Sequence, residues 1–197
     1  MTDPRAIRSR QAMLRTARDI LQREGPAAVT HQRVAREAGV GRATVYRHWA
    51  RPEQLLLEAM GPLEMPFFRD PRSPVRPWLH AQLRRLADEL AVPAIVASSA
   101  TLMQGALVDP AVAERRDATV ATLTRHLAAA LNLAATTGEL TDAAGAQDAA
   151  AILVGPLQYR MMMQVGEVPD AMIDRLLAAV GTWHIKRART PRRTTRQ

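Results

Sequence analysis

The stretch Thr30–Met60, THQRVAREAGVGRATVYRHWARPEQLLLEAM, carries the pattern that decides the fold. Its apolar residues recur at the three- and four-residue spacing that is typical of helices. Thr30 is a suitable N-cap, because its hydroxyl can accept a free backbone N–H, and a helix is predicted over 31–38. Gly39 suits the left-handed backbone of a tight turn, and a second helix is predicted over 42–49. The stretch therefore predicts two short helices joined by a turn.

Small and apolar residues are placed where the two predicted helices would cross. Ala35 lies four positions before Gly39, and Val45 lies six positions after it. The small Ala35 side chain allows the helices to approach closely, whereas Val45 fills the space between them. Val34 and Trp49 also turn inward at helical spacing. Two helices joined in this way by a short turn that contains glycine form a helix-turn-helix unit.

The second helix has a polar outer face that suits nucleic acid. Arginine can donate to guanine, threonine can contact a thymine methyl group, and tyrosine and histidine can reach phosphates. No acidic residue occurs between Gly41 and Arg51, although a surface helix that serves only solubility usually carries glutamate and lysine. Two other interpretations remain open: Tyr46 packs partly against the core, and Arg42 is a solvated surface charge.

Further helices are predicted on both sides of this unit. Met1–Ile7 is expected to be a loose arm, followed by a helix that runs to about Glu24 and ends at Gly25–Pro26. The arginines of this segment either face solvent or contact phosphates, with Arg5 and Arg8 as the best candidates for contact. Pro52 suits the first position of a connecting helix, where its missing N–H costs nothing.

Residues 7–60 resemble the DNA-binding domain of TetR-family transcriptional regulators. The residues that carry the resemblance are the apolar positions of the first helix, Gly25, Thr30, Val34-Ala35, Ala38-Gly39-Val40, Thr44-Val45-Tyr46-Arg47-His48-Trp49 and Leu55-Leu56. The resemblance implies an all-helical homodimer with one N-terminal DNA-binding domain in each subunit. It places the expected DNA contacts at Thr30, His31, Gln32, Arg42, Ala43, Thr44, Tyr46, Arg47 and His48. The family usually has a phosphate-contacting lysine where this chain has Pro52, so that contact is lost or passes to Arg51.

The rest of the chain is predicted to form a larger helical domain. Prolines in residues 62–77 exclude a continuous helix and mark a linker between the helix-turn-helix domain, residues 1–61, and a helical domain at 78–187. Residues 188–197 are predicted to be a disordered basic tail, which either adds affinity for DNA or serves only solubility. The helices expected after residue 74 span about 75–91, 93–106, 110–133, 142–165 and 169–187, with a kink at Gly155-Pro156.

The last two of these helices are apolar on more than one face, which indicates that a partner covers them. Two such helices from each of two subunits can pack as a four-helix bundle. The expected interface residues are Ile152, Leu153, Leu157, Met161, Ile173, Leu176, Leu177 and Val180. The run Gly155–Arg160, GPLQYR, also resembles the C-terminal regulatory domain of one branch of the TetR family, in which these helices form the dimer.

The resemblance further implies a cavity in the C-terminal domain that binds a small, often apolar effector. The candidate lining residues are Trp78, Leu83, Leu102, Met103, Leu123, His126, Tyr159 and Met163. Gln104, His126 and Gln158 are candidates for polar anchoring of such a molecule. Ordinary core packing is the alternative for each apolar candidate, and nothing in the composition identifies the effector.

Composition and charge limit the class of protein. With 197 residues, of which 47% are hydrophobic, the chain can form one or two folded domains. Cysteine is absent, which excludes disulfides and thiolate metal sites, and the five histidines lack a metal-ligand spacing. Residues 1–60 carry 11 arginines and six acids, residues 61–185 carry ten arginines and 13 acids, and residues 186–197 carry six basic residues and no acid. The positive ends favour a polyanion as partner.

No signal peptide and no membrane-spanning segment is predicted, which favours the cytoplasm. We expect an all-α, one-component transcriptional regulator, a repressor that binds a palindromic operator as a homodimer and is released by a small-molecule effector. The alternative is a DNA-binding regulator without an effector, which acts constitutively or through a partner protein. An enzyme in the helical domain is a third hypothesis, for which the sequence offers no catalytic motif and no cofactor motif.

Overall fold

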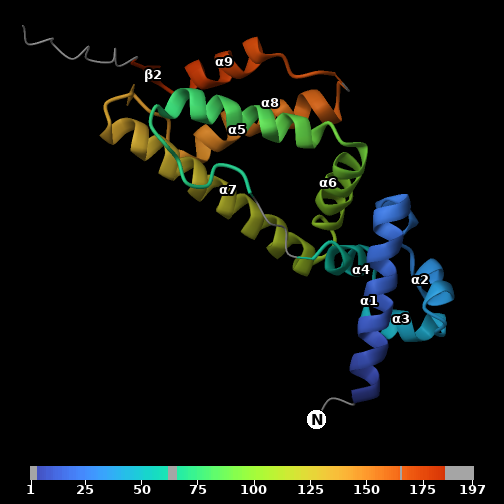
Figure 1. The fold of residues 1–197 in the computed structure, drawn as a ribbon. Coiled ribbons are helices and arrows are strands. Elements are labelled where there is room, and N and C mark those ends of the chain that lie inside the picture. The colour runs from blue at the N-terminus through green and yellow to red at the C-terminus, as the bar shows by residue number, and fades with distance from the viewer. Residues whose placement is uncertain (1–3, 62–65, 165, 185–197) are drawn as a thin grey trace, which may run out of the picture.

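The computed structural model describes residues 4–61, 66–164 and 166–184. Within these residues the chain is almost entirely helical, which confirms the all-α class (Figure 1). The elements in chain order are α1 (Pro4–Glu24), the 3-10 helix η1 (Pro26–Ala28), α2 (His31–Glu37), α3 (Arg42–His48), α4 (Pro52–Ala59), α5 (Val75–Leu90), α6 (Pro93–Gly105), α7 (Pro110–Thr136), β1 (Leu140–Thr141), α8 (Ala146–Met162), α9 (Asp170–Ala179) and β2 (Thr182–Trp183). The predicted basic tail and residues 62–65 of the predicted linker lie outside the described residues.

α1 is the long helix against which the other N-terminal helices pack. It begins at Pro4, so the expected loose arm is wrong for residues 4–7. Proline is tolerated in the first turn of a helix, and no further proline or glycine occurs before Gly25. The fully buried residues of α1 recur at helical spacing and are Met13, Ala17 and Ile20.

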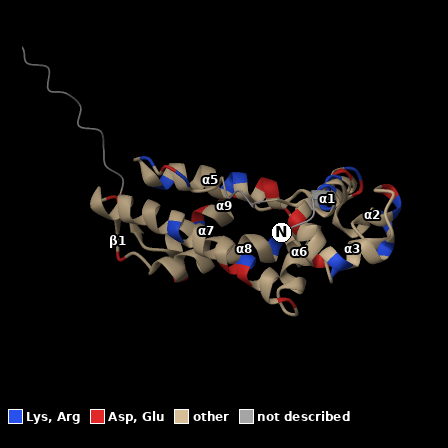
Figure 2. Ribbon diagram, turned by 90° about the horizontal axis from the view of Figure 1, so that it is seen from below, with Lys and Arg blue, Asp and Glu red and all other residues tan. Residues whose placement is uncertain are grey.

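Local signals begin and end the short helices as the sequence predicts. The Thr30 hydroxyl accepts the backbone N–H of Arg33 at 3.2 Å, which caps α2. Gly39 has a φ of 66° in the turn, a conformation that glycine adopts at little cost. Pro52 occupies the first turn of α4. The short helices α2 and α3 both pack against α1. Figure 2 shows basic segments on all three helices at one end of the molecule.

The larger part of the chain has a separate hydrophobic core. α5, α7, α8 and α9 pack around it, and α6 stands between them and the N-terminal helices (Figure 1). The largest fully buried side chains of this core are Phe68, Leu79, Leu83, Leu127, Leu140, Leu153, Leu157, Ile173 and Leu177. Full burial of one such side chain contributes about 1.5–3 kcal/mol, so this core is the main source of stability for these helices.

Part of the predicted linker belongs to this core. Phe67 and Phe68 are buried, and the Phe68 N–H donates to the side-chain oxygen of Gln82 at 3.0 Å. α5 begins at Val75, where the Glu139 carboxylate accepts the Val75 N–H at 2.6 Å. The second half of the predicted linker is therefore attached to the C-terminal helices.

The last part of the chain departs from the expected single helix over 169–187. α9 ends at Ala179, and Thr182–Trp183 pairs with Leu140–Thr141 in a two-stranded antiparallel sheet. Gly181, with a φ of 149°, lies between the helix and the strand. The expected helix is therefore wrong over residues 180–184, because the backbone at Gly181 turns the chain toward β1, and its last residues, 185–187, lie outside the described residues.

Replacing Gly181 with alanine is expected to lower the free energy of unfolding by about 2–4 kcal/mol, because backbone strain and steric overlap add at this position. A Cβ atom there would lie 2.8 Å from Leu140 Cδ1 and 2.9 Å from the Thr141 carbonyl oxygen. Gly138→Ala is the matched control, since Gly138 has a φ of 68° and open space around it. The control is expected to lose about 1 kcal/mol. Urea denaturation measures both variants, and equal losses would contradict the steric explanation.

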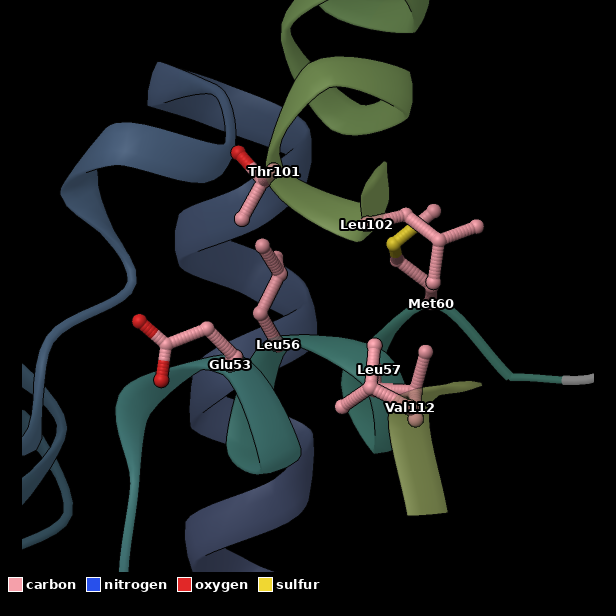
Figure 3. Close-up of a pocket in the computed structure, with 7 residues that line it drawn as sticks. All are labelled: Glu53, Leu56, Leu57, Met60, Thr101, Leu102 and Val112. Carbon is pink, nitrogen blue, oxygen red and sulfur yellow. The ribbon is translucent and has the colours of Figure 1, made fainter. Parts of the chain in front are cut away.

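α4 joins the N-terminal helices to α6 and α7. Figure 3 shows side chains of these three helices meeting around a small cavity. The lining residues are Glu53, Leu56, Leu57, Met60, Thr101, Leu102 and Val112. The cavity measures about 10 Å³, which is at the lower limit for a single water molecule. The joint between α4, α6 and α7 is therefore tightly filled.

Hydrogen bonds cross the same joint. The Gln54 amide donates to the Asp109 carboxylate at 2.6 Å, and Asp109 also caps the N-terminus of α7. Arg115 donates to the carbonyl of Leu57 at 2.9 Å and to that of Gly61. Burial lowers the pKa of the Arg115 guanidinium from its ordinary value. Both ends of α4 are thus attached to α7 or to the loop before it.

By length and apolar composition, no individual helix of the described part would cross a membrane, and Val75–Leu90 with Ile95–Gly105 qualifies only as a pair with an 86° bend. In the same part of the chain, no group of three or more His, Asp and Glu side chains is placed to hold a metal ion.

Candidate nucleic-acid interface

α2 and α3 are held in a fixed helix-turn-helix arrangement. Ala35 and Val45 are both buried. In the turn, the Val40 N–H donates to the Ala35 carbonyl at 3.0 Å. Val34 is buried in the same hydrophobic cluster. These positions confirm the packing that the sequence predicts for the two helices.

The end of α3 is fixed through Trp49 and a carboxylate of α4. Trp49 is buried, and its indole N–H donates to Glu58 Oε2 at 2.7 Å. The same oxygen accepts from Arg10 of α1 at 2.6 Å. The Arg10 guanidinium also lies 5.2 Å from the centroid of the Trp49 ring, a favourable cation–π distance. Because these contacts connect α1, α3 and α4, they set the direction in which α3 presents its outer face.

The outer face of α3 presents two arginines. The Arg42 guanidinium donates to the Tyr46 hydroxyl at 3.1 Å and lies 5.4 Å from the centroid of that ring. Arg47 donates to the Thr44 hydroxyl at 3.2 Å. The ion pairs that the described residues form include neither arginine. Both guanidinium groups are therefore available to phosphate oxygens and base edges.

Arginines at the end of α1 and on α2 are matched by acids instead. Arg33 forms ion pairs with Glu37 and, at 2.6 Å, with Glu24. Arg23 pairs with Glu37 at 2.9 Å. The hydrogen bond from Arg33 lowers the pKa of the Glu37 carboxyl. Exposed pairs of this kind add little stability, but they compensate the charges of Arg23 and Arg33, whereas Arg42 and Arg47 of α3 have no acidic partner among the ion pairs of the described residues.

The structure leaves nine of the ten expected DNA contacts exposed or half-buried at the surface. These nine are Thr30, Gln32, Arg42, Ala43, Thr44, Tyr46, Arg47, His48 and Arg51. His31 is the exception, at 3% exposure. Its ring packs against that of Tyr46, with 4.2 Å between centroids. This corrects the expected surface position of His31, because the first turn of α2 packs against α3.

Arg51 has a second partner that the sequence does not indicate. Its guanidinium donates to the Val108 carbonyl at 3.0 Å, in the loop between α6 and α7. The side chain remains exposed, and a guanidinium has five N–H donors. The expected phosphate contact at Arg51 therefore stays a prediction.

Family comparisons agree with this geometry. Residues 13–59 match the family model described as bacterial regulatory proteins of the tetR family. Residues 75–180 match the model described as a tetracyclin repressor-like C-terminal domain. The chain belongs to the TetR family of transcriptional regulators. The members of this family are DNA-binding regulators and not enzymes.

Solved structures of TetR-family regulators share the fold of this chain. The TetR family transcription regulator SCO0332 is 26% identical, with a TM-score of 0.56 over 86% of this chain and 94% of that one. SmeT, solved in complex with triclosan, is 22% identical, with a TM-score of 0.58 over 88% and 92%. NalD of Pseudomonas aeruginosa, the secondary repressor of the MexAB-OprM multidrug efflux pump, is 19% identical, with a TM-score of 0.56 over 90% and 96%. No curated protein sequence matches the chain.

In this TetR-family chain the expected effector residues do not surround one cavity. Met103 and Leu123 line an open groove of about 740 Å³ between α7 and α8, together with Gln158. Leu83 is fully buried in the core, and Leu102 lines the small cavity at α4. The other four are half-buried or exposed and lie outside that groove: Trp78, His126, Tyr159 and Met163. Two of the eight candidates, Met103 and Leu123, therefore line the same groove.

Most of the expected dimer residues of the TetR-family chain lie in the core of their own subunit. The five that are fully buried within one chain are Leu153, Leu157, Ile173, Leu177 and Val180. α8 packs on α5 and α7, and α9 packs on α5, so these side chains are not available to a partner. The three that are half-buried are Ile152, Met161 and Leu176. The apolar faces that suggested a dimer therefore serve largely the core of the subunit.

The sequence pattern did not reveal the residues that tie α4 to α7. Asp109 caps α7 and also accepts from Gln54, 55 positions earlier. Arg115 contacts the Leu57 carbonyl across a similar separation. No local pattern indicates such pairs. One sequence feature could have indicated the contact of Arg115: this arginine lies on the same side of α7 as the buried Val112.

Proposed function

We propose that this TetR-family regulator is a one-component repressor, which binds a near-palindromic operator as a homodimer and releases it when a small molecule binds the C-terminal domain. The observation that supports DNA reading is the exposed pair Arg42 and Arg47, which has no acidic partner in the described part of the chain. A dimer would present two copies of α3 about 34–36 Å apart, one helical repeat of DNA. That spacing requires two half-sites related by symmetry.

We place the proposed dimer contact on the outer faces of α8 and α9. Tyr159 and Met163 are large apolar side chains with exposures of 59% and 71%. A hollow of about 440 Å³ beside Tyr159 is lined by Ala151, Gly155 and Met172 among others. Two such faces related by a two-fold axis can pack as a four-helix bundle. Light scattering on the purified protein is expected to give twice the chain mass of 21.7 kDa.

The groove between α7 and α8 is the proposed effector site. Its volume of about 740 Å³ falls within the range of roughly 300–1,000 Å³ that small-molecule sites occupy. Apolar side chains of Met103, Val120, Leu123 and Val154 line it, and Gln158 supplies a polar group. The methionine can adapt to ligands of different shape. The triclosan complex of SmeT supports a small molecule as effector in a chain of this fold.

Release requires that α7 moves the DNA-binding domain, and the Gln54–Asp109 hydrogen bond is a testable part of that connection. Alanine at both positions, compared with each single variant, is expected to show a coupling of about 1.5–3 kcal/mol in the free energy of unfolding, as for a hydrogen bond to a charged group. Urea denaturation of the four proteins measures it. Asp109→Asn is the control, because asparagine can both cap α7 and accept from Gln54. Strictly additive losses would show that the bond does not couple α4 to α7.

Selection of DNA from a random-sequence library by the full-length protein tests the proposed function. The expected result is enrichment of one near-palindromic site, which then represses a reporter gene when placed at its promoter. The Arg42→Ala and Arg47→Ala double variant should enrich no site under the same conditions. Binding that is independent of sequence and disappears with added salt would contradict the proposal, because that behaviour comes from phosphate contacts alone.

A regulator without an effector is the second candidate, and one observation favours it. Leu83, an expected cavity residue, is fully buried in a filled core, and the groove at α7 and α8 is open to solvent. Thermal denaturation against a panel of small apolar compounds separates the two candidates. An effector that binds the folded state raises the melting temperature with its concentration, whereas the second candidate predicts no such compound and unchanged repression.

A further inference from the structure

His31 is the expected DNA contact that the structure buries, and one nitrogen atom of its ring is unsatisfied there. Nε2 of His31 has no solvent contact and no hydrogen-bond partner among the described residues. A buried polar atom of this kind is rare in folded proteins and costs free energy. A phenylalanine would fill the same space without this cost. Histidine differs from phenylalanine at this position because its ring can gain a proton.

The ring of His31 lies behind the exposed side chains of α3. Its centroid is 4.2 Å from that of Tyr46, with 46° between the planes, which is a favourable tilted contact. Tyr46 in turn contacts Arg42 through its hydroxyl at 3.1 Å and through its ring at 5.4 Å. His31, Tyr46 and Arg42 thus form a stack that runs from the core to the surface. A movement of the buried ring would displace the two exposed side chains.

We propose that His31 is a positioning residue of the DNA-reading face: its neutral ring holds the Tyr46–Arg42 pair in place, and its protonation releases that pair. The functional consequence, a loss of operator affinity in acid, rests on the proposed operator binding. The structural consequence, a change at Tyr46 that accompanies protonation of His31, does not depend on operator binding.

The groups around His31 favour the neutral ring. Burial is the largest influence and lowers the pKa of His31 below its ordinary value. Arg42 of α3 acts in the same direction through charge repulsion, while the backbone at Trp49, the carboxylate of Glu53 on α4 and the backbone at Arg51 oppose it. Glu53 is the one acidic group among these influences. Protonation would therefore create a second positive charge next to Arg42 at a site that excludes water.

The lowered pKa of His31 determines how the stability of the fold depends on pH. The folded protein binds a proton at His31 less readily than the unfolded chain, whose histidine titrates near about pH 6.5. The stability that His31 contributes is therefore complete above that pH and is lost as the pH falls. Release of the Tyr46–Arg42 pair follows as the pH drops through the lowered pKa of the folded state.

A comparison of wild type with His31→Phe tests the functional part. Phenylalanine keeps a ring against Tyr46 but cannot gain a proton. Affinity for the DNA site selected at neutral pH is measured by fluorescence anisotropy from about pH 7.5 to about pH 5. The ratio of wild-type to variant affinity is expected to fall in acid by about two- to tenfold, the range for loss of an aromatic pair. Effects of pH on other groups of the interface are common to both proteins and cancel in the ratio. A constant ratio would overturn the proposal.

NMR of the wild-type protein without DNA tests the structural part and needs no variant. The His31 ring is expected to titrate with a midpoint below the ordinary value, and the Tyr46 ring resonances should shift with that same midpoint. Tyr46 resonances that stay constant while His31 titrates would overturn the proposal, as would a His31 midpoint above the ordinary value. If no DNA site can be selected, the proposed function fails, and these resonances still decide whether His31 positions Tyr46.

Discussion

Trp49→Ala is expected to lower the free energy of unfolding by about 3–5 kcal/mol, the usual loss when a large buried aromatic side chain is removed, and to abolish selective binding of DNA. Trp49 is 3% exposed, and its indole lies where α1, α3 and α4 meet. The substitution removes this packing and also leaves Glu58 Oε2 without its indole donor. Since the total stability of a protein is only about 5–15 kcal/mol, the loss is a large part of it. Urea denaturation followed by circular dichroism measures the effect.

Trp49→Phe separates packing from hydrogen bonding at this position. Phenylalanine retains most of the buried ring but cannot donate to Glu58, whose carboxylate keeps Arg10 as a partner at 2.6 Å. The expected loss is about 1–2 kcal/mol, near that of a single hydrogen bond, with selective DNA binding retained. If both variants lost the same stability, the hydrogen bond and not the packing would hold the end of α3.

The helix-turn-helix could be predicted in detail because its determinants are local. The cap at Thr30, the turn at Gly39 and the inward positions of Ala35 and Val45 each depend on residues only a few positions away. Their burial follows directly from helical spacing. The carboxylate that fixes Trp49 could not be inferred in this way, because its position depends on how α4 returns to α1.

His31 shows where prediction from helical spacing ends. The pattern correctly places it at the start of α2, but spacing alone does not determine whether a first turn faces solvent or a neighbouring helix. The crossing of α2 over α3 decides this, and it puts the ring against Tyr46. An expected surface contact therefore became a buried one, although the family resemblance and the helix were correct.

The C-terminal helices show the same limit on a larger scale. An apolar pattern on two faces of a helix indicates two neighbours, but it does not say whether these belong to the same subunit. Leu153 and Leu177 turned out to face their own core. Gly181 is a local signal for a helix end. The strand that follows it could not be predicted, because its partner at Leu140–Thr141 lies about forty residues earlier in the chain. Asp142, with a φ of 52°, likewise delays the start of α8 beyond the predicted residue.

Replacing Arg42 or Arg47 with alanine is expected to lower operator affinity by about 1–3 kcal/mol for each half-site, the range for a well-placed contact of arginine with a base. Since a homodimer carries each substitution twice, the loss for the whole complex is about 2–6 kcal/mol, or roughly thirtyfold to more than ten-thousandfold. Fluorescence anisotropy with the selected DNA site measures it. Arg72→Ala is the matched control, because Arg72 is exposed in the loop before α5, outside the proposed DNA and dimer faces, and its removal changes the net charge equally.

The salt dependence of the same variants distinguishes the two kinds of contact that α3 can make. Loss of a phosphate contact reduces the slope of log affinity against log salt by about 0.9 for each contact and weakens all DNA sequences alike. Loss of a base contact leaves that slope nearly unchanged and relaxes selectivity at one position of each half-site. The hydrogen bond from Arg42 to Tyr46 restrains the Arg42 side chain, which favours a contact of fixed geometry and hence base reading at Arg42. Affinity that equals that of the Arg72→Ala control at every salt concentration would exclude both arginines from the interface.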